Sequence, residues 1–102
     1  MWNKILKEFS ENPRDVHTIP KVKKEPMWFF VYEEYGNIYI EKARSHESSS
    51  SIQHRLRLKK EEIEIMKNIY DKRNEGESVS HLATKSSWMS VYWYGIFAEM
   101  NL

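Results

Sequence analysis

The segment from residue 27 to residue 41 constrains the fold more than any other part of this 102-residue chain. Residues 27–32 (MWFFVY) are rich in aromatic and β-branched types, and residues 37–41 (NIYIE) alternate between apolar and polar types, as strands do. Between them, EEYG supplies a polar turn in which Gly36 accepts a positive φ. We therefore expect an antiparallel hairpin over 27–41. Successive strand residues point to opposite faces, so Ile38 and Ile40 would face the core and leave Tyr39 and Glu41 on the other side.

Shorter signals surround this hairpin. A helix is expected over residues 2–9, where apolar residues recur at helical spacing: Ile5, Leu6 and Phe9. It should end near Pro13, because the residue before a proline is pushed out of the α region. The proline-bearing stretch 13–26 indicates an irregular connection with an edge strand at 17–19. In residues 52–58, apolar and basic residues partly alternate, which predicts a third strand with a positive outer face.

The last third of the chain has helical periodicity. A helix over 59–73 is expected to carry one apolar stripe, made of Ile63, Met66, Ile69 and Tyr70. Gly76 suits a left-handed position at its end, and Ser78 suits the N-cap of a short next helix. That short helix would bury Val79, Leu82 and Ala83. A final helix over 88–100 would turn Val91 inward and Trp93 outward, because residues two apart on a helix point about 200° from each other.

The order of these pieces over residues 59–100 resembles the DNA-binding helix-turn-helix of resolvases, invertases and small repressors. A glycine precedes the Ser-Val-Ser run at 78–80, Ala83 follows, and a Val-Tyr pair lies inside the last helix at 91–92. The turn is about two residues shorter than in that family, and it carries Ser86-Ser87 where a glycine is usual. The resemblance implies that the last helix presents its first residues to a major groove. It places Lys85 on phosphate and five residues near bases: Ser86, Ser87, Met89, Ser90 and Trp93.

Positive charge is concentrated in residues 42–60. This segment carries six Lys or Arg and one Glu, a net charge of +5, in a chain of net charge +1. We interpret it as a footprint for phosphate, or alternatively as a solvated surface balanced by the acidic helix that follows. The serine-rich loop 45–51 has the same two interpretations, a phosphate ligand or a flexible connector. The basic candidates for binding nucleic acid are Arg44, Arg55, Arg57 and Lys59.

The sequence lacks the residues that several kinds of site chemistry require. The chain has no cysteine, which removes disulfides, thiol nucleophiles and cysteine-ligated zinc. Its four histidines are too dispersed for an evident metal site, and its three glycines form no phosphate-cradling loop. Residues 39–43 (YIEKA) resemble the second strand motif of GIY-YIG nucleases, with Arg55 as the candidate catalytic arginine. Glu41, however, stands where that family has a glycine. From all of these observations together, we expect a protein that is not an enzyme, with no catalytic residue, no metal and no cofactor.

Together these patterns predict a single α+β domain over 1–102, mainly β over 1–58 and helical over 59–102. No apolar run approaches the roughly 18 residues of a membrane span, so we expect a cytoplasmic protein without a membrane partner. The leading hypothesis is a small non-enzymatic DNA-binding or regulatory protein. The alternative is a protein-interaction module, a dimerising accessory or inhibitor protein that uses exposed aromatic residues among Trp88, Tyr92 and Trp93. A nuclease is the third hypothesis.

Overall fold

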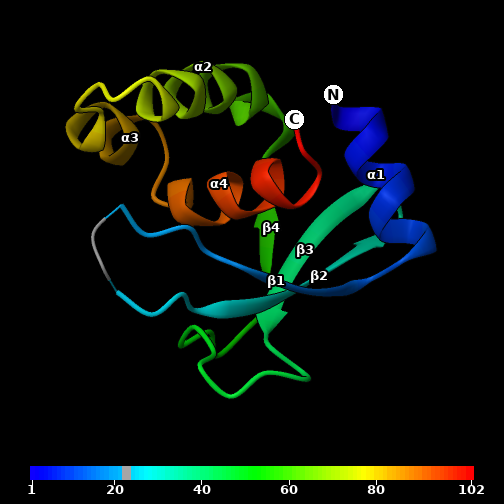
Figure 1. The fold of residues 1–102 in the computed structure, drawn as a ribbon. Coiled ribbons are helices and arrows are strands. Elements are labelled where there is room, and N and C mark those ends of the chain that lie inside the picture. Colours follow the sequence, from blue (N-terminus) through cyan, green and yellow to red (C-terminus); the bar gives the residue numbers. More distant parts are fainter. Residues whose placement is uncertain (22–23) are drawn as a thin grey trace. The chain divides into compact units, whose positions relative to one another are not determined.

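The computed structural model of this chain describes residues 1–21 and 24–102, and it has the α+β fold that the sequence predicts. It divides into two compact units, Met1–Leu58 and Lys59–Leu102. The first unit contains the N-terminal helix and the antiparallel sheet, and the second contains helices (Figure 1). The boundary between the two units coincides with the change from strand-type to helix-type periodicity in the sequence.

In the first unit, helix α1 (Trp2–Glu11) packs on strands β2 (Trp28–Glu34) and β3 (Asn37–Lys42). The sheet is antiparallel with the order β1-β2-β3-β4, so β1 (Arg14–His17) and β4 (Leu56–Leu58) form its edges. The predicted N-terminal helix is confirmed. Apolar side chains that are at most 1% exposed come from every element of this unit: Ile5, Phe9, Val16, Phe29, Val31, Ile38, Ile40 and Leu58.

The predicted hairpin is confirmed in β2 and β3. Glu34 pairs with Asn37, and the two residues between them, Tyr35 and Gly36, have φ values of 52° and 78°. Two successive positive φ values are typical of the type I′ turn, whose twist matches that of the flanking strands. The Gly36 N–H also donates a hydrogen bond of 2.8 Å to the Glu33 carboxylate. The turn thus sets the register that places Ile38 and Ile40 in the core.

The first edge strand lies earlier than predicted. The sequence indicated a strand at 17–19, whereas β1 occupies 14–17 and begins directly after Pro13. The burial of Val16 explains the position of β1. Its apolar side chain reaches the core, and the residue pairs with Phe29 of β2. The Thr18 N–H extends the pairing by one hydrogen bond of 2.9 Å to the Met27 carbonyl. Residues 22–23 of the predicted irregular connection lie outside the described residues.

The strand predicted over 52–58 forms only at its end, as β4. Ile40 pairs with Leu56, so residue 54 would come opposite Lys42, where β3 ends. After that point the Ala43 N–H donates to the Ser49 hydroxyl at 2.9 Å instead of continuing a ladder. Residues 52–55 therefore stay outside β4, although residues 54 and 55 come opposite the last two residues of β3.

In the second unit, a 3-10 turn (Lys60–Glu62) leads into helix α2 (Ile63–Asn74), which is followed by α3 (Ser80–Ser86) and α4 (Ser90–Glu99). Each pair of these three α-helices is in contact. The predicted stripe of α2 is buried, with every member at most 8% exposed: Ile63, Met66, Ile69 and Tyr70. Gly76 has a φ of 92°, as its predicted left-handed position requires.

Helix α3 differs from prediction at its start and on its inner side. Val79, not Ser78, is the N-cap residue, and no side chain caps the helix. The Val79 carbonyl accepts the first helical hydrogen bond from the Ala83 N–H at 2.8 Å. Val79 and Ala83 are buried as predicted, but Leu82 is 46% exposed. The small Ala83 side chain faces inward because it allows α3 to pack closely, and Leu82 is left outside.

The predicted orientation of α4 is wrong. Trp93 has no exposed surface, whereas Val91 is 48% exposed. The Trp93 indole N–H donates to the Glu62 carboxylate at 3.3 Å, and its ring centroid lies 5.5 Å from that of Phe97. Because α4 is apolar on nearly every side, its periodicity does not specify an inner face. The bulk of the indole and its hydrogen bond decide the orientation instead.

Candidate functional site

Aromatic side chains gather on the face of the sheet opposite the core of the first unit. Phe29 and Val31 of β2 point into the core, so Phe30 and Tyr32 lie on the other face. Tyr39 of β3 is the direct cross-strand partner of Tyr32. The ring centroids are 5.8 Å apart for Phe30 and Tyr32, and 5.7 Å apart for Tyr32 and Tyr39. We call these three half-buried side chains the aromatic face.

Three arginines lie at the aromatic face. The guanidinium carbon of Arg44 is 3.9 Å from the centroid of the Phe30 ring, and that of Arg55 is 3.9 Å from the Tyr39 centroid. Cations at this distance are attracted by the ring quadrupole. Arg57 is the cross-strand neighbour of Tyr39 and is exposed. Within the part of the chain that the structure describes, no carboxylate lies within ion-pair distance of Arg57.

Two carboxylates hold the other arginines in place. Arg44 pairs with Glu41 at 3.1 Å and Arg55 with Glu34 at 3.0 Å, and these four side chains are 33–61% exposed. The Tyr32 hydroxyl donates to Glu41 at 3.3 Å and accepts from Arg55 at 3.3 Å. These bonds to Tyr32 and Glu34 raise the pKa of Arg55, which keeps its guanidinium charged. Water screens such exposed ion pairs, so a phosphate can replace a carboxylate at small cost.

The Asp15 carboxylate fixes the backbone that carries Arg44. It accepts hydrogen bonds from the N–H groups of Arg44 at 2.9 Å and Ser45 at 2.7 Å, and pairs with His46 Nδ1 at 2.8 Å. Burial by itself raises the pKa of Asp15, but these three hydrogen bonds outweigh burial and the pKa is lowered. The His46 ring in turn stacks on Trp28 with centroids 3.5 Å apart. Asp15 therefore anchors the start of the loop to β1.

The serine-rich loop is fastened to the sheet by its backbone. The Trp28 N–H donates to the Ser48 carbonyl at 2.7 Å, and the Ser50 N–H donates to the Trp28 carbonyl at 2.9 Å. The Ser49 hydroxyl accepts from Ala43 and donates to the Ser50 carbonyl, so it is already engaged within the loop. These bonds do not fit a free connector. They give the loop a positioning role, since it holds Arg44 over Phe30.

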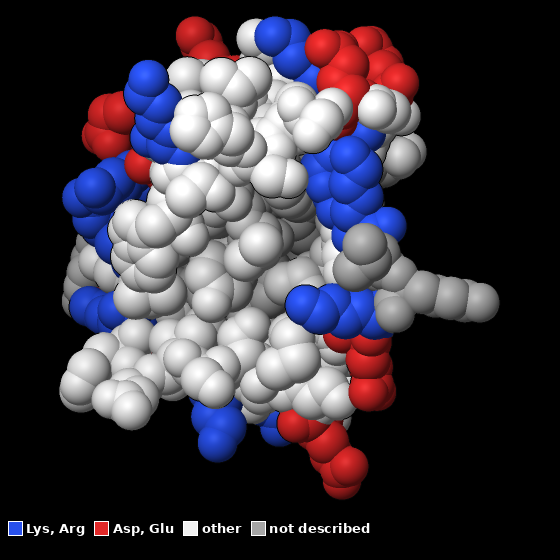
Figure 2. All heavy atoms as spheres, turned by 90° about the vertical axis from the view of Figure 1, so that its left-hand side faces the viewer, with Lys and Arg blue, Asp and Glu red and all other residues white. Residues whose placement is uncertain are grey.

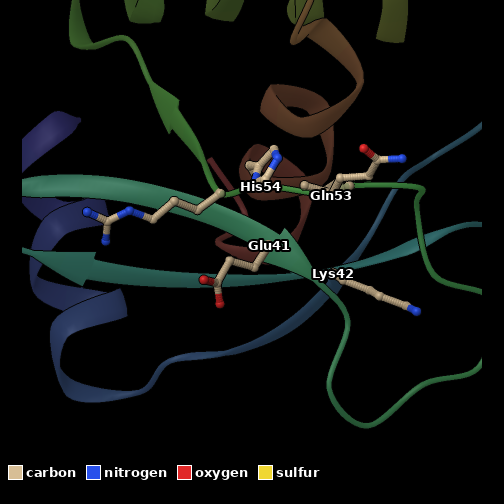
Figure 3. A pocket seen from close by; sticks show the side chains of 6 residues that line it. Glu41, Lys42, Gln53 and His54 are labelled. Carbon is tan, nitrogen blue, oxygen red and sulfur yellow. The ribbon is translucent and has the colours of Figure 1, made fainter.

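A hollow of about 250 Å³ lies at the end of β3. Its lining comes from two segments: Glu41 and Lys42 of β3, and Ile52, Gln53, His54 and Arg55 ahead of β4. Figure 3 shows Gln53 and His54 leaving the segment that leads into β4, and Glu41 pointing away from both of them. Two of its lining residues, Arg55 and Glu41, also contact the aromatic face, whereas Lys42 is the cross-strand partner of Phe29 and lies on the core side of the sheet.

The structure brings together three of the residues that the sequence proposed as nucleic-acid ligands: Arg44, Arg55 and Arg57. The others belong to the second unit. There Lys59 and Lys85 are exposed, and Ser86 and Ser90 are half-buried. The helix-turn-helix hypothesis stays a prediction, carried by these four residues.

Three residues that this hypothesis turned toward DNA are buried. Ser87 is 5% exposed, and its hydroxyl donates to the Glu62 carboxylate at 2.8 Å and accepts from the Met89 N–H at 3.1 Å. Trp93 shares the same carboxylate. Met89, which was also placed near bases, is 2% exposed. These side chains are therefore unavailable to a ligand, because they stabilise the start of α4 from inside.

The aromatic face was missed as a site, although its signal is present in the sequence. Strand alternation separates Tyr39 from the core, and the same alternation separates Phe30 and Tyr32 once Phe29 is taken as buried. The run of aromatic residues at 28–30 hides this, because an uninterrupted apolar run has no evident polar face.

The described residues carry neither a group of His, Asp or Glu suited to a metal ion nor a helix long and apolar enough to cross a membrane. On the face drawn in Figure 2, Lys and Arg side chains stand in separate groups, several of them beside Asp or Glu. No family model, curated protein or solved structure matches this chain. The chemistry of the aromatic face is thus the main guide to function.

Proposed function

We propose that this protein binds single-stranded nucleic acid through the aromatic face of its first unit. The observation that carries the proposal is the pairing of ring and cation, with Arg44 over Phe30 and Arg55 over Tyr39, each at 3.9 Å. Proteins recognise unpaired bases by stacking them on aromatic rings and on guanidinium planes. Both kinds of surface occur together on this face.

The spacing of the aromatic face suits unpaired bases. The Phe30 and Tyr32 ring centroids, two residues apart on β2, are separated by 5.8 Å, well beyond the roughly 3.4 Å between stacked bases along one strand of a duplex. A strand whose bases are splayed apart can therefore place successive bases on Phe30, Tyr32 and Tyr39. Stacking on an aromatic side chain contributes about 1–3 kcal/mol per base. A paired duplex keeps its bases stacked on one another and does not offer them to this face.

The charges of the face favour phosphate moderately. Three arginines stand against two carboxylates, Glu34 and Glu41, and Arg57 is the arginine without an ion pair among the described residues. Each neutralised phosphate of a single strand contributes a slope of about −0.7 to the dependence of log K on log salt. With few phosphate contacts, stacking supplies most of the binding energy, and the salt dependence is shallow.

The test is a titration of fluorescein-labelled oligouridine of eight nucleotides, followed by anisotropy. We expect the parent to bind this strand more tightly than a duplex of equal length. Tyr39→Ala removes one stacking surface and should weaken binding about 5- to 150-fold. Circular dichroism and thermal unfolding establish that the variant keeps its fold, since Tyr39 lies outside the core.

Two matched substitutions, each of which removes one positive charge, test which of the two units binds the strand. Arg57→Ala should flatten the salt slope by about 0.7, whereas Lys85→Ala in the second unit should leave oligouridine binding unchanged. If the parent does not bind single strands at low salt, the proposal is wrong. If it binds duplex DNA and Lys85→Ala alone abolishes this, the helix-turn-helix of the second unit is the DNA-binding element.

Protein binding by the second unit is a second candidate. Its α3–α4 region exposes three large apolar side chains, Leu82 at 46%, Trp88 at 66% and Val91 at 48%. Exposed tryptophan is enriched at the centres of protein interfaces. Sedimentation of the parent and of Trp88→Ser tests self-association. A monomer at all concentrations in both proteins would eliminate the dimer version of this candidate.

A further inference from the structure

The Trp28 side chain, two residues before Phe30 on β2, carries a second ring on its surface. Trp28 lies on the same side of the sheet as Phe30, because Phe29 between them is buried in the core. The His46 imidazole stacks on the Trp28 indole with ring centroids 3.5 Å apart and an angle of 6° between the planes. The indole therefore covers one plane of the imidazole. The His46 side chain is 40% exposed, so its open surface lies on the other plane and along the ring edge.

The position of His46 repeats that of Arg44. These residues are two apart in the same loop, and each lies over a ring of β2, Arg44 over Phe30 at 3.9 Å and His46 over Trp28. The Asp15 carboxylate joins them, since it accepts from the Arg44 N–H at 2.9 Å and bonds to His46 Nδ1 at 2.8 Å. The loop thus presents two planar groups along β2, so the row of planar groups continues from the aromatic face to His46.

The bond to Asp15 determines where His46 takes up a proton. A carboxylate oxygen can only accept, so Nδ1 of the imidazole carries a hydrogen and Nε2 is the nitrogen that becomes protonated. Histidine is the side chain that changes charge between pH 5 and 8. The ring can therefore gain a positive charge without losing its bond to Asp15 or its stack on the indole.

Charged groups face this stack from the strands and from the loop. From β1, Asp15 bonds to the imidazole, and the His17 ring lies edge-on to the indole with centroids 5.0 Å apart. Arg44 shares the Asp15 carboxylate, and Glu25 reaches the loop at the Ser48 hydroxyl, 3.4 Å away. The surrounding charges are thus of both signs. A proton gained by the imidazole shifts their balance toward phosphate.

We infer that His46 is a further base-stacking site of the nucleic-acid surface and that its protonation tightens binding of the strand. This inference rests on the proposed function and adds to it one site and a dependence on pH. Histidine is among the side chains on which proteins stack unpaired bases. The open plane of the imidazole offers such a surface next to Arg44, and the protonated ring also attracts the phosphates of the strand.

The experiment measures the affinity for eight-nucleotide oligouridine from about pH 5 to about pH 8, the range in which histidine titrates. Uracil and the phosphodiester keep their charge over this range, so a change in affinity arises in the protein. We expect the affinity of the parent to rise roughly two- to fivefold toward acid pH, the size of one exposed charge interaction. The salt slope should steepen by up to about 0.7 at acid pH, because the protonated ring neutralises one more phosphate.

Two replacements of His46 separate stacking from charge. His46→Phe keeps a flat ring that cannot be protonated, so it should bind like the parent at about pH 8 and lose the pH dependence. His46→Ala removes the ring as well and should bind roughly fivefold more weakly even at the alkaline end. His81→Ala removes an exposed histidine of α3 and is the control, which should change neither quantity. Thermal unfolding establishes that each variant keeps its fold.

The outcomes separate the two proposals. If the parent binds the strand equally well at every pH, or if His46→Ala binds like the parent, the inference about His46 is overturned and the proposed function stands. A pH dependence that persists in His46→Phe also overturns it, because another group such as His17 then carries the effect. Absence of binding by the parent at every pH overturns both.

Discussion

The guanidinium of Arg55 lies 3.9 Å from the centre of the Tyr39 ring and also bonds to the Tyr32 hydroxyl and the Glu34 carboxylate. One side chain thus connects the segment ahead of β4 to both strands of the hairpin. The same cation forms part of the surface on which we propose that bases stack. Its position shows how the basic segment and the strand pattern, which are separate signals in the sequence, meet at one place in the fold.

Replacing a stacked arginine by lysine should weaken binding even though the charge is kept. Arg44→Lys removes the planar group that lies over Phe30, so affinity for oligouridine should fall roughly two- to fivefold. Arg57→Lys is the control, because we assign Arg57 to phosphate, where a point charge suffices. Anisotropy titrations compare the two. Equal affinities would argue that Arg44 contributes through its charge alone.

Alanine substitutions at the two α4 residues whose orientation the sequence mispredicted should differ in their effect on protein stability. Trp93→Ala empties a fully buried site and removes the hydrogen bond to Glu62, so we expect a loss of about 3–5 kcal/mol in the free energy of unfolding. Val91→Ala, at an exposed position, should change it by less than about 0.5 kcal/mol. Urea denaturation of both variants provides the measurement. A large effect at Val91 with a small one at Trp93 would contradict the orientation of α4.

The hairpin turn can be improved. Tyr35 is 92% exposed and has a φ of 52°, a left-handed conformation that costs a non-glycine residue about 1–2 kcal/mol. Asparagine tolerates this conformation and precedes glycine in type I′ turns. Tyr35→Asn should therefore raise the free energy of unfolding, by about 0.5–1 kcal/mol. A decrease, measured by thermal unfolding, would mean that the Tyr35 side chain makes a stabilising contact that the structure does not contain.

Asp15 should make stability depend on pH. Its pKa is lowered from 3.8, so its contribution is complete at neutral pH and is lost as the pH falls through the folded-state value. We expect Asp15→Asn to lower the free energy of unfolding by about 1–3 kcal/mol at pH 7. The gap to the parent should close as the pH drops below 3.8.

A matched control is Asp71→Asn in α2, where the carboxylate is 51% exposed and pairs with Lys67 one helical turn away. That substitution should have a small effect at any pH, because exposed pairs contribute little. Denaturation curves at several pH values compare the variants. A gap between Asp15→Asn and the parent that stays constant from neutral to acid pH would show that the charge of Asp15 is not what stabilises the loop.

Much of the fold follows from local pattern. The hairpin is specified by its aromatic and branched strands around a Tyr-Gly turn, and the α2 stripe is specified by its three- and four-residue spacing. These signals suffice because β3 and α2 each have one apolar side, which can be buried in only one way, and the turn then sets the register of β2. The basic segment was likewise evident in the sequence, and three of its arginines lie at the proposed site.

Tertiary structure decided the remainder. Strand β1 forms where the Val16 side chain reaches the core, and β3 ends at Lys42, after which the Ala43 N–H donates to the Ser49 hydroxyl. Helix α4 is apolar on nearly all sides, so packing of Trp93 against Phe97 and its bond to Glu62 chose its inner face. The aromatic face and the hollow have the same origin, because they combine residues that local periodicity cannot relate. Distances between segments far apart in the chain are set by how the whole core packs.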